Sequence, residues 1–339
     1  MASLPADPRS LSTLRRPAAR LPGLDALRGI AALAVLGYHA SGHFGGGPPT
    51  LFTKGYLAVD FFFMLSGYVM ARTYETRMAQ GLGAWRFLWA RYKRLWPVMA
   101  AGTALGAPLL AEELGAIPML PGIALANLLL LPVFVGGLIF PVNAAAWSIL
   151  FELGANWLHG ALLWRLRTVA LVGLTALSLA MMIAACLHFG SFDIGARPAN
   201  VLGGVPRAIL SYVAGVVLWR WWRDRPPFLL PATLTFLAMP AFLLLTDFAD
   251  NTSPVVDFAF VLLLCPLLVA GGLCYEGDHP LARWTGLLSF PLYAVHMPML
   301  HWAKELGWDA TTGLAAALLV AGAMTLWINR PPALRLATA

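Results

Sequence analysis

Charged residues are scarce in this sequence. Only 12% of its 339 residues are Asp, Glu, Lys or Arg, and 59% are hydrophobic. A soluble domain carries roughly 25% charged and about 45–50% apolar residues, so this composition excludes an ordinary soluble protein. Apolar stretches long enough to cross a bilayer recur from residue 24 to residue 328. We therefore predict an all-α polytopic membrane protein.

Cysteine and lysine are also rare. The three cysteines show no CxxC spacing, which argues against a disulfide framework and a zinc site, so we expect no metal. Arginine accounts for 20 of the 23 basic residues, and the net charge is +7. This charge lies in short segments between apolar stretches, where it sets the orientation in a membrane. We therefore expect contacts with membrane lipids and no nucleic-acid partner.

The two ends of the chain lack apolar character. Residues 1–22 are rich in Pro, Ser and Arg, and we expect a disordered cytoplasmic tail there. Residues 23–331 form the expected single membrane domain, and residues 332–339 form a second cytoplasmic tail.

About ten transmembrane helices are predicted. Their approximate ranges are 24–43, 56–72, 95–112, 145–164, 168–189, 204–221, 228–246, 254–273, 285–303 and 310–328. The further stretch 117–140 contains three prolines and a Gly-Gly pair, so we expect a re-entrant or surface-lying segment that lines a cavity. With ten crossings, 18 of the 23 basic residues lie on the side of the N-terminus. This asymmetry predicts that both termini are cytoplasmic, and the composition fits a bacterial inner membrane.

Three ionisable side chains of the first predicted span, Asp25, Arg28 and His39, lie toward one side of the helix. A charge at the bilayer centre costs at least about 2.5–3.5 kcal/mol, so such residues usually have a function. Arg28 and His39 are separated by three helical turns plus about 20°, so they face the same way about 16.5 Å apart along the axis. Asp25 lies about 60° from Arg28. The alternative is that Asp25 and Arg28 anchor the helix at the interface and that His39 is a hydrogen-bonded core residue.

Two carboxylates are predicted at a depth similar to that of His39. Asp60 lies in the second span and Glu152 in the fourth, both in the outer half of the membrane. Either could orient the imidazole of His39 and stabilise its protonated form, in a cavity open to the outside. The alternative for both is a polar contact between helices.

Basic residues gather in the predicted inner loop 72–94, which includes Arg91 and Arg94. They can set orientation and contact anionic lipids. They can also hold phosphate, because the guanidinium fork fits phosphate oxygens. His296 in the ninth span is expected to pack in or beside a cavity.

Five segments of the chain resemble, in order, those of the acyltransferase-3 family of membrane acyltransferases. They are 24–29 with the Arg-x10-His pair, 55–67, 91–97, 147–152 and 289–298. The resemblance spans about residues 22 to 331. Many family members end in Glu-Arg-Pro, where this chain has Asn329-Arg330-Pro331.

The resemblance implies transfer of an acetyl or related acyl group, often to hydroxyls of surface or exported glycans. It implies that His39 is catalytic and that Arg28 is its functional partner. Further candidates for substrate binding are Asp25, Arg91, Arg94, Trp147, Tyr293 and His296.

Both lines of reasoning lead to one mechanism. Acyl-CoA, a donor substrate and not a permanently bound cofactor, would enter from the cytoplasm with its phosphates near Arg91, Arg94 and Arg28. His39 would act as a general base on the acceptor hydroxyl of a glycan or lipid-linked sugar, or would form a transient acyl-histidine. Asp60 or Glu152 would orient the imidazole. The alternatives are a transporter or flippase for a lipid-linked sugar, and a membrane sensor or assembly partner without chemistry.

Overall fold

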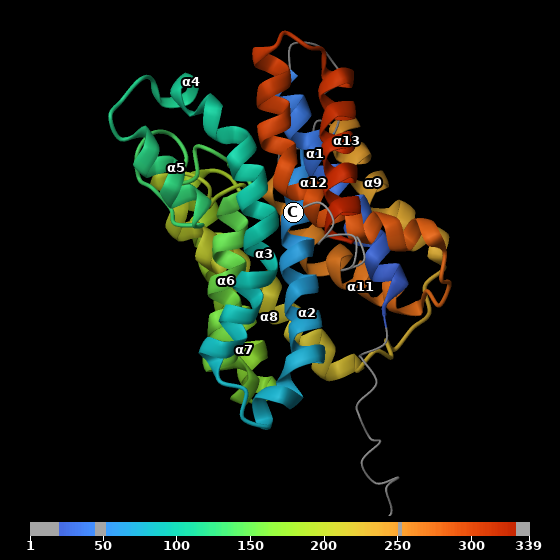
Figure 1. The fold of residues 1–339 in the computed structure, drawn as a ribbon. Coiled ribbons are helices and arrows are strands. Elements are labelled where there is room, and N and C mark those ends of the chain that lie inside the picture. Colours follow the sequence, from blue (N-terminus) through green and yellow to red (C-terminus); the bar gives the residue numbers. More distant parts are fainter. Residues whose placement is uncertain (1–19, 45–51, 250–252, 330–339) are drawn as a thin grey trace, which may run out of the picture.

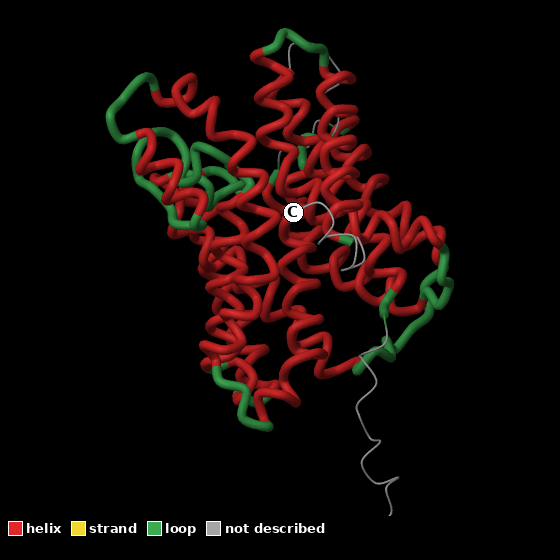
Figure 2. Tube along the Cα trace, in the orientation of Figure 1, coloured by secondary structure: helices red, strands yellow, loops and turns green. Residues whose placement is uncertain are grey.

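The computed structural model describes residues 20–44, 52–249 and 253–329. Within these ranges the chain is helical and contains no strand, so the all-α prediction is confirmed for the described part (Figures 1 and 2). Most of the predicted tail 1–22, all of the tail 332–339, and Arg330 and Pro331 lie outside the described residues.

Each predicted span overlaps one helix, or two helices in the case of 254–273. The bounds are α1 Pro22–Phe44, α2 Ala58–Ala79, α3 Ala84–Gly106, α6 Ala146–Ala161, α7 Thr168–Phe189, α8 Gly204–Trp222, α9 Ala232–Phe248, α10 Pro254–Ala259 with α11 Cys265–Cys274, α12 Pro280–Glu305 and α13 Ala310–Ile328. By length and composition, four stretches of the described chain can each cross a membrane, namely Thr168–Phe189, Pro198–Trp222, Pro254–Cys274 and Ala310–Ile328. The chain is therefore a helical membrane protein.

The helices form two groups that lie side by side in Figure 1. One group contains α2, α3, α6, α7 and α8, and the other contains α1, α9, α11, α12 and α13. Helix α12 connects the groups, because it packs against α1 and α13 on one side and against α3 on the other. The turn between α2 and α3 lies at the bottom of the view, and the turn between α12 and α13 lies at the top.

Two glycines allow α2 and α8 to approach closely. A Cβ atom at Gly67 would overlap the carbonyl oxygen of Tyr212, and one at Gly215 would overlap the carbonyl oxygen of Met64. Small residues at such reciprocal positions let membrane helices pack backbone to backbone. This contact fixes the α2 wall of the cavity described below.

The basic segment 72–94 is more helical than predicted. Helix α2 continues to Ala79 and α3 already begins at Ala84, so Arg91 and Arg94 lie on α3 and not in a loop. Arginine is a good helix former, and a helix can extend beyond the apolar stretch that crosses the membrane. The side chains of both arginines consequently have fixed directions.

The proline-rich segment 117–140 folds as a short helix followed by irregular backbone. Helix α5, Leu120–Leu128, follows the five-residue helix α4, Leu110–Leu114, and is too short to cross a bilayer. The side chain of Asn127 donates to the carbonyl of Leu131 and accepts from the backbone N–H of Val142, so part of the irregular backbone is hydrogen-bonded. No residue of this segment lines the main cavity described below.

Candidate active site

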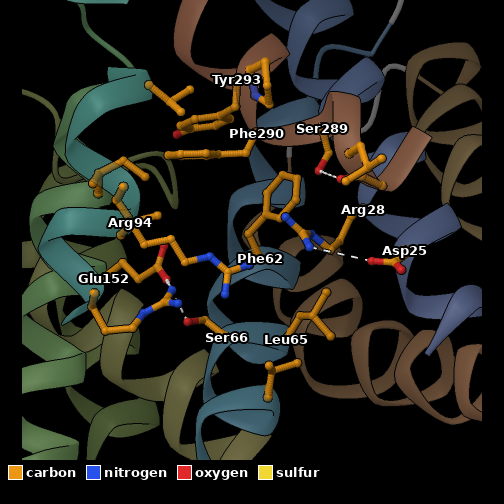
Figure 3. Close-up of a pocket in the computed structure, with 18 of the residues that line it drawn as sticks. Asp25, Arg28, Phe62, Leu65, Ser66, Arg94, Glu152, Ser289, Phe290 and Tyr293 are labelled. Atoms are coloured by element: carbon orange, nitrogen blue, oxygen red, sulfur yellow. Dashed lines mark hydrogen bonds and ion pairs between the residues drawn. The ribbon is translucent and has the colours of Figure 1, made fainter. Parts of the chain in front are cut away.

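A cavity of about 550 Å³ lies between the two groups of helices (Figure 3). Helices α1, α2, α3, α6, α12 and α13 line it, so segments from the whole length of the chain meet there. Six of the ten predicted site residues line this one cavity: Asp25, Arg28, Arg91, Arg94, Glu152 and Tyr293.

Two arginines face each other across the cavity. In Figure 3 the side chains of Arg28 and Arg94 extend into it from α1 and α3. The nearest carboxylate to Arg28 is Asp25, at 3.7 Å, and Asp25 is held more closely by Arg20, at 2.7 Å. Within the described residues Arg94 makes no hydrogen bond or ion pair. Both guanidinium groups therefore have free donors for an anion.

A third arginine is held by the carboxylate of Glu152. Arg91 donates to that carboxylate at 2.9 Å, and Ser66 donates to the same oxygen at 2.8 Å (Figure 3). The Nε atom of Arg91 is buried and has no partner among the described residues. Glu152 thus fixes an arginine in the cavity wall, and it does not contact His39 as we had expected.

Aromatic rings narrow the other end of the cavity. The hydroxyl of Tyr293 lies 2.5 Å from that of Ser148, and its ring meets the edge of Phe62 with 6.0 Å between centroids. Phe63 and Phe290 add apolar wall. The cavity therefore combines a cationic region with an apolar end that is closed by Tyr293.

His39 lies just beyond this closed end. Its Nδ1 atom is 3.2 Å from Nε2 of His296, which stands three residues, or about 4.5 Å along the helix axis, beyond Tyr293. The two rings have their centroids 4.9 Å apart. His296 is 1% exposed, whereas His39 is half-buried. The two histidines that the sequence predicted separately thus form a pair.

On its other side His39 borders a second hollow of about 390 Å³. This hollow is more open and is also lined by Tyr38, His43 and Thr53. Tyr38 is held in place because its hydroxyl donates to Asp193 at 2.8 Å. His39 therefore lies between two spaces. Tyr293 separates it from the arginine-lined cavity, and the second hollow is open to it directly.

The carboxylate of Asp60 is not directed at His39. It forms a buried ion pair with Arg207 of α8 at 2.9 Å, and both side chains are 0% exposed. Arg207 also donates to Asp193 at 3.1 Å, and the ring of Trp147 lies 5.3 Å from its guanidinium carbon. We had expected Asp60 to orient the imidazole and Trp147 to bind substrate. The structure places both around a buried arginine outside the cavity.

Sequence reasoning missed Arg207, Ser66 and Ser148 as parts of the site and its surroundings. The signal for Arg207 was present, because it is an ionisable residue inside an apolar span, but we had counted it only for orientation. Serine gives no such signal, since its hydroxyl is common in membrane helices. Within the described residues, no group of three or more His, Cys, Asp or Glu side chains could hold a metal ion.

Comparisons with known proteins show which family the sequence matches. Residues 21–328 match the sequence profile of the acyltransferase domain of the acyltransferase-3 family. The chain is 34% identical over 184 residues to protein 2 in the picA locus of Rhizobium radiobacter, covering 48% of this chain and 93% of that protein. It is 25% identical over 327 residues to the putative peptidoglycan O-acetyltransferase YrhL of Bacillus subtilis (strain 168), covering 83% of this chain.

The chain spans about half of the second relative, 48% of its length. No solved structure gives a significant match. The profile, however, extends over nearly the whole membrane domain, including α1 with Arg28 and His39 and α12 with Tyr293 and His296. The chain therefore belongs to the acyltransferase-3 family and is a membrane acyltransferase.

Proposed function

We propose that this protein transfers an acyl group from acyl-CoA, bound in the arginine-lined cavity, to a glycan hydroxyl that reaches His39 from the opposite side. One observation carries the proposal: Tyr293 separates a cavity that contains two guanidinium groups with free donors from a histidine pair about one helical turn further on.

The donor is inferred from the chemistry of the cavity. Arg28 and Arg94 have free N–H donors that suit phosphate oxygens, and Arg91 is prearranged by Glu152. Phe62, Phe63 and Phe290 offer an apolar path for a long, thin chain such as the pantetheine arm. Arg28 and His39 are about 16.5 Å apart along α1, a distance that such an arm spans in extended form.

In the transfer step His39 acts as the base. Its imidazole takes the proton of the acceptor hydroxyl while the hydroxyl oxygen attacks the thioester carbonyl. The C–S bond then breaks, the CoA thiolate leaves, and it recovers the proton from the imidazolium. In the acyl-histidine route the imidazole nitrogen itself attacks the thioester carbonyl, the C–S bond breaks and the CoA thiolate leaves. The acceptor oxygen then displaces the imidazole, and the hydroxyl proton passes to the thiolate.

The donor and acceptor sides follow from the proposed topology. Ten helices cross the membrane between residues 23 and 331, and both termini are in the cytoplasm of a bacterial cell, at its inner membrane. The basic residues at the ends of α2, α3 and α8 support this orientation. The arginine-lined cavity then opens toward cytoplasmic acyl-CoA, and the hollow beside His39 opens outward.

A cell-surface or exported glycan, or a lipid-linked sugar precursor, is the proposed acceptor. The name of the Bacillus relative, a putative peptidoglycan O-acetyltransferase, supports transfer to a sugar hydroxyl. The more open hollow at His39 also suits an acceptor that is larger than an acyl group.

The test compares surface and secreted glycans from cells that produce wild-type protein or the His39→Ala variant. Mass spectrometry before and after mild base treatment is expected to reveal a base-labile mass increment with wild type only. The control is His188→Ala, which removes a histidine at the end of α7, away from both cavities. Equal acylation by the His39→Ala variant, at equal protein abundance, would refute the role of His39.

A further inference from the structure

The ring nitrogens of His296 have unequal surroundings. Its Nδ1 atom lies 2.8 Å from the carbonyl oxygen of Tyr293 and 3.3 Å from that of Leu292. A carbonyl oxygen can only accept, so a lone pair on Nδ1 would face two other lone pairs. Nδ1 of His296 therefore carries the proton, and Nε2 of the neutral ring presents a lone pair to His39.

His39 also carries its proton on Nδ1. Its Nδ1 atom lies 3.0 Å from the carbonyl oxygen of Val35 and 3.2 Å from Nε2 of His296. Both partners accept, so Nδ1 of His39 must be the donor. Any other arrangement of protons on the two neutral rings places lone pairs against each other at one of these contacts.

We propose that His296 is a positioning residue of this enzyme, and that together with the carbonyl oxygen of Val35 it holds His39 in the tautomer whose basic nitrogen is Nε2. A carboxylate often has this role beside a catalytic histidine. Here Asp60 and Glu152 contact arginines, and the neutral imidazole of His296 accepts the hydrogen bond that a carboxylate accepts in those enzymes. The inference rests on the proposed role of His39 in acyl transfer.

The pair also suits the charged state that catalysis produces. When Nε2 of His39 takes up the acceptor proton, Nδ1–H keeps both hydrogen bonds unchanged. The bond to Nε2 of His296 then becomes charge-assisted and stronger. No side chain has to move between the neutral and protonated states, which is the kind of prearrangement that lowers a barrier.

Nitrogen-15 spectra of histidine-labelled protein in membranes test the assignment directly. They are recorded at alkaline pH, where the rings are neutral, and the His39 signals are assigned as those lost in the His39→Ala variant. We expect the proton on Nδ1 of His39 in wild type. In the His296→Leu variant only the carbonyl of Val35 remains as an acceptor, so we expect a smaller population of this tautomer. A proton on Nε2 of His39 in wild type, or an unchanged tautomer in His296→Leu, would overturn the proposal.

Steady-state rates add a second, independent test. His296→Leu is expected to lower kcat on the order of 10²-fold, while KM for acyl-CoA changes little. His296→Gln keeps an oxygen acceptor near the position of Nε2, so it should retain the Nδ1–H tautomer and most of the rate. Equal losses in the Leu and Gln variants would contradict a positioning role.

His301→Leu provides the matched control. It removes a histidine from the same helix, about 140° further round, so the tautomer of His39 should stay as in wild type. The control for the rate is His188→Leu, which removes a histidine at the end of α7, away from both cavities. The spectra do not depend on turnover, so they report the tautomer of His39 even if His39 proves unnecessary for acylation.

Discussion

Individual side chains divide the cavity into a cationic region and an apolar end. Asp25 binds Arg20 more closely than Arg28, at 2.7 Å against 3.7 Å, and Glu152 binds Arg91, so Arg28 and Arg94 keep free donors. Carboxylates that neutralise some arginines and leave others exposed to the cavity create a local excess of positive charge.

Arg94 is expected to bind the donor and to leave the chemical step unaffected. Arg94→Gln should raise KM for acyl-CoA by roughly 10- to 100-fold with little change in kcat, because a hydrogen bond to a charged group contributes about 1.5–3 kcal/mol. Arg94→Lys should be intermediate, since an ammonium group lacks the guanidinium fork.

The control for this experiment is Arg86→Gln, on the same helix but exposed and outside the cavity. Titration of purified protein with acyl-CoA of one chain length gives both constants. A fall in kcat at unchanged KM would assign Arg94 to the chemical step instead.

Tyr293 is expected to limit the size of the acyl group. Its ring closes the apolar end of the cavity and is fixed by the hydrogen bond to Ser148. Tyr293→Ala should raise the ratio of kcat/KM for hexanoyl-CoA over acetyl-CoA by at least about 10-fold, since each methylene in an apolar pocket contributes about 1–3 kcal/mol. Tyr293→Phe keeps the ring and should leave the ratio unchanged. A similar ratio in all three proteins would show that another group sets the limit.

At the scale of elements, the contact between α2 and α8 supports the α2 wall of the cavity. Gly67 and Gly215 bring the two backbones together, and Asp60 and Arg207 join the N-terminal ends of the same helices. The ion pair is completely buried, so each charge depends on the other for compensation.

Removal of one partner should therefore destabilise the protein strongly. Arg207→Met leaves the carboxylate of Asp60 buried without a counter-charge, and the expected cost is about 3–5 kcal/mol. The double variant Asp60→Leu with Arg207→Met should recover much of this loss. Thermal unfolding in detergent measures both, and Arg197→Gln, an exposed arginine in the same outer region, serves as control. A double variant as unstable as Arg207→Met would mean that the remaining partners of Arg207 matter more than Asp60.

At the scale of the whole molecule, the proposed topology places the two openings of the site on opposite sides of the membrane. The α2–α3 turn and the α12–α13 turn lie at opposite ends of the bundle (Figure 1). The basic residues of α2 and α3 lie toward the first of these turns, which the positive-inside rule assigns to the cytoplasm.

Cysteine labelling tests this arrangement. In a variant with the three native cysteines replaced by alanine, Leu306→Cys should react with a membrane-impermeant maleimide in right-side-out vesicles. Gln80→Cys should react only after the vesicles are opened. Labelling of both positions from one side would contradict the proposed topology and with it the separation of donor and acceptor.

The membrane class, the approximate positions of the helices and six of the cavity residues could be predicted from the sequence. Apolar length and charge asymmetry are properties of local composition, so they can be read without knowledge of neighbours. For the same reason Arg28 and His39 stand out, because an ionisable group in an apolar stretch is costly wherever it lies.

Only the tertiary structure decided which of these groups contact one another. Asp60, Glu152 and His39 lie at similar predicted depths, yet Asp60 pairs with Arg207, Glu152 with Arg91, and His39 with His296. Depth along a helix follows from chain position, but the rotation of each helix about its axis is set by packing against its neighbours. The partner of His39 could therefore not be predicted from the sequence, although both histidines had been singled out there.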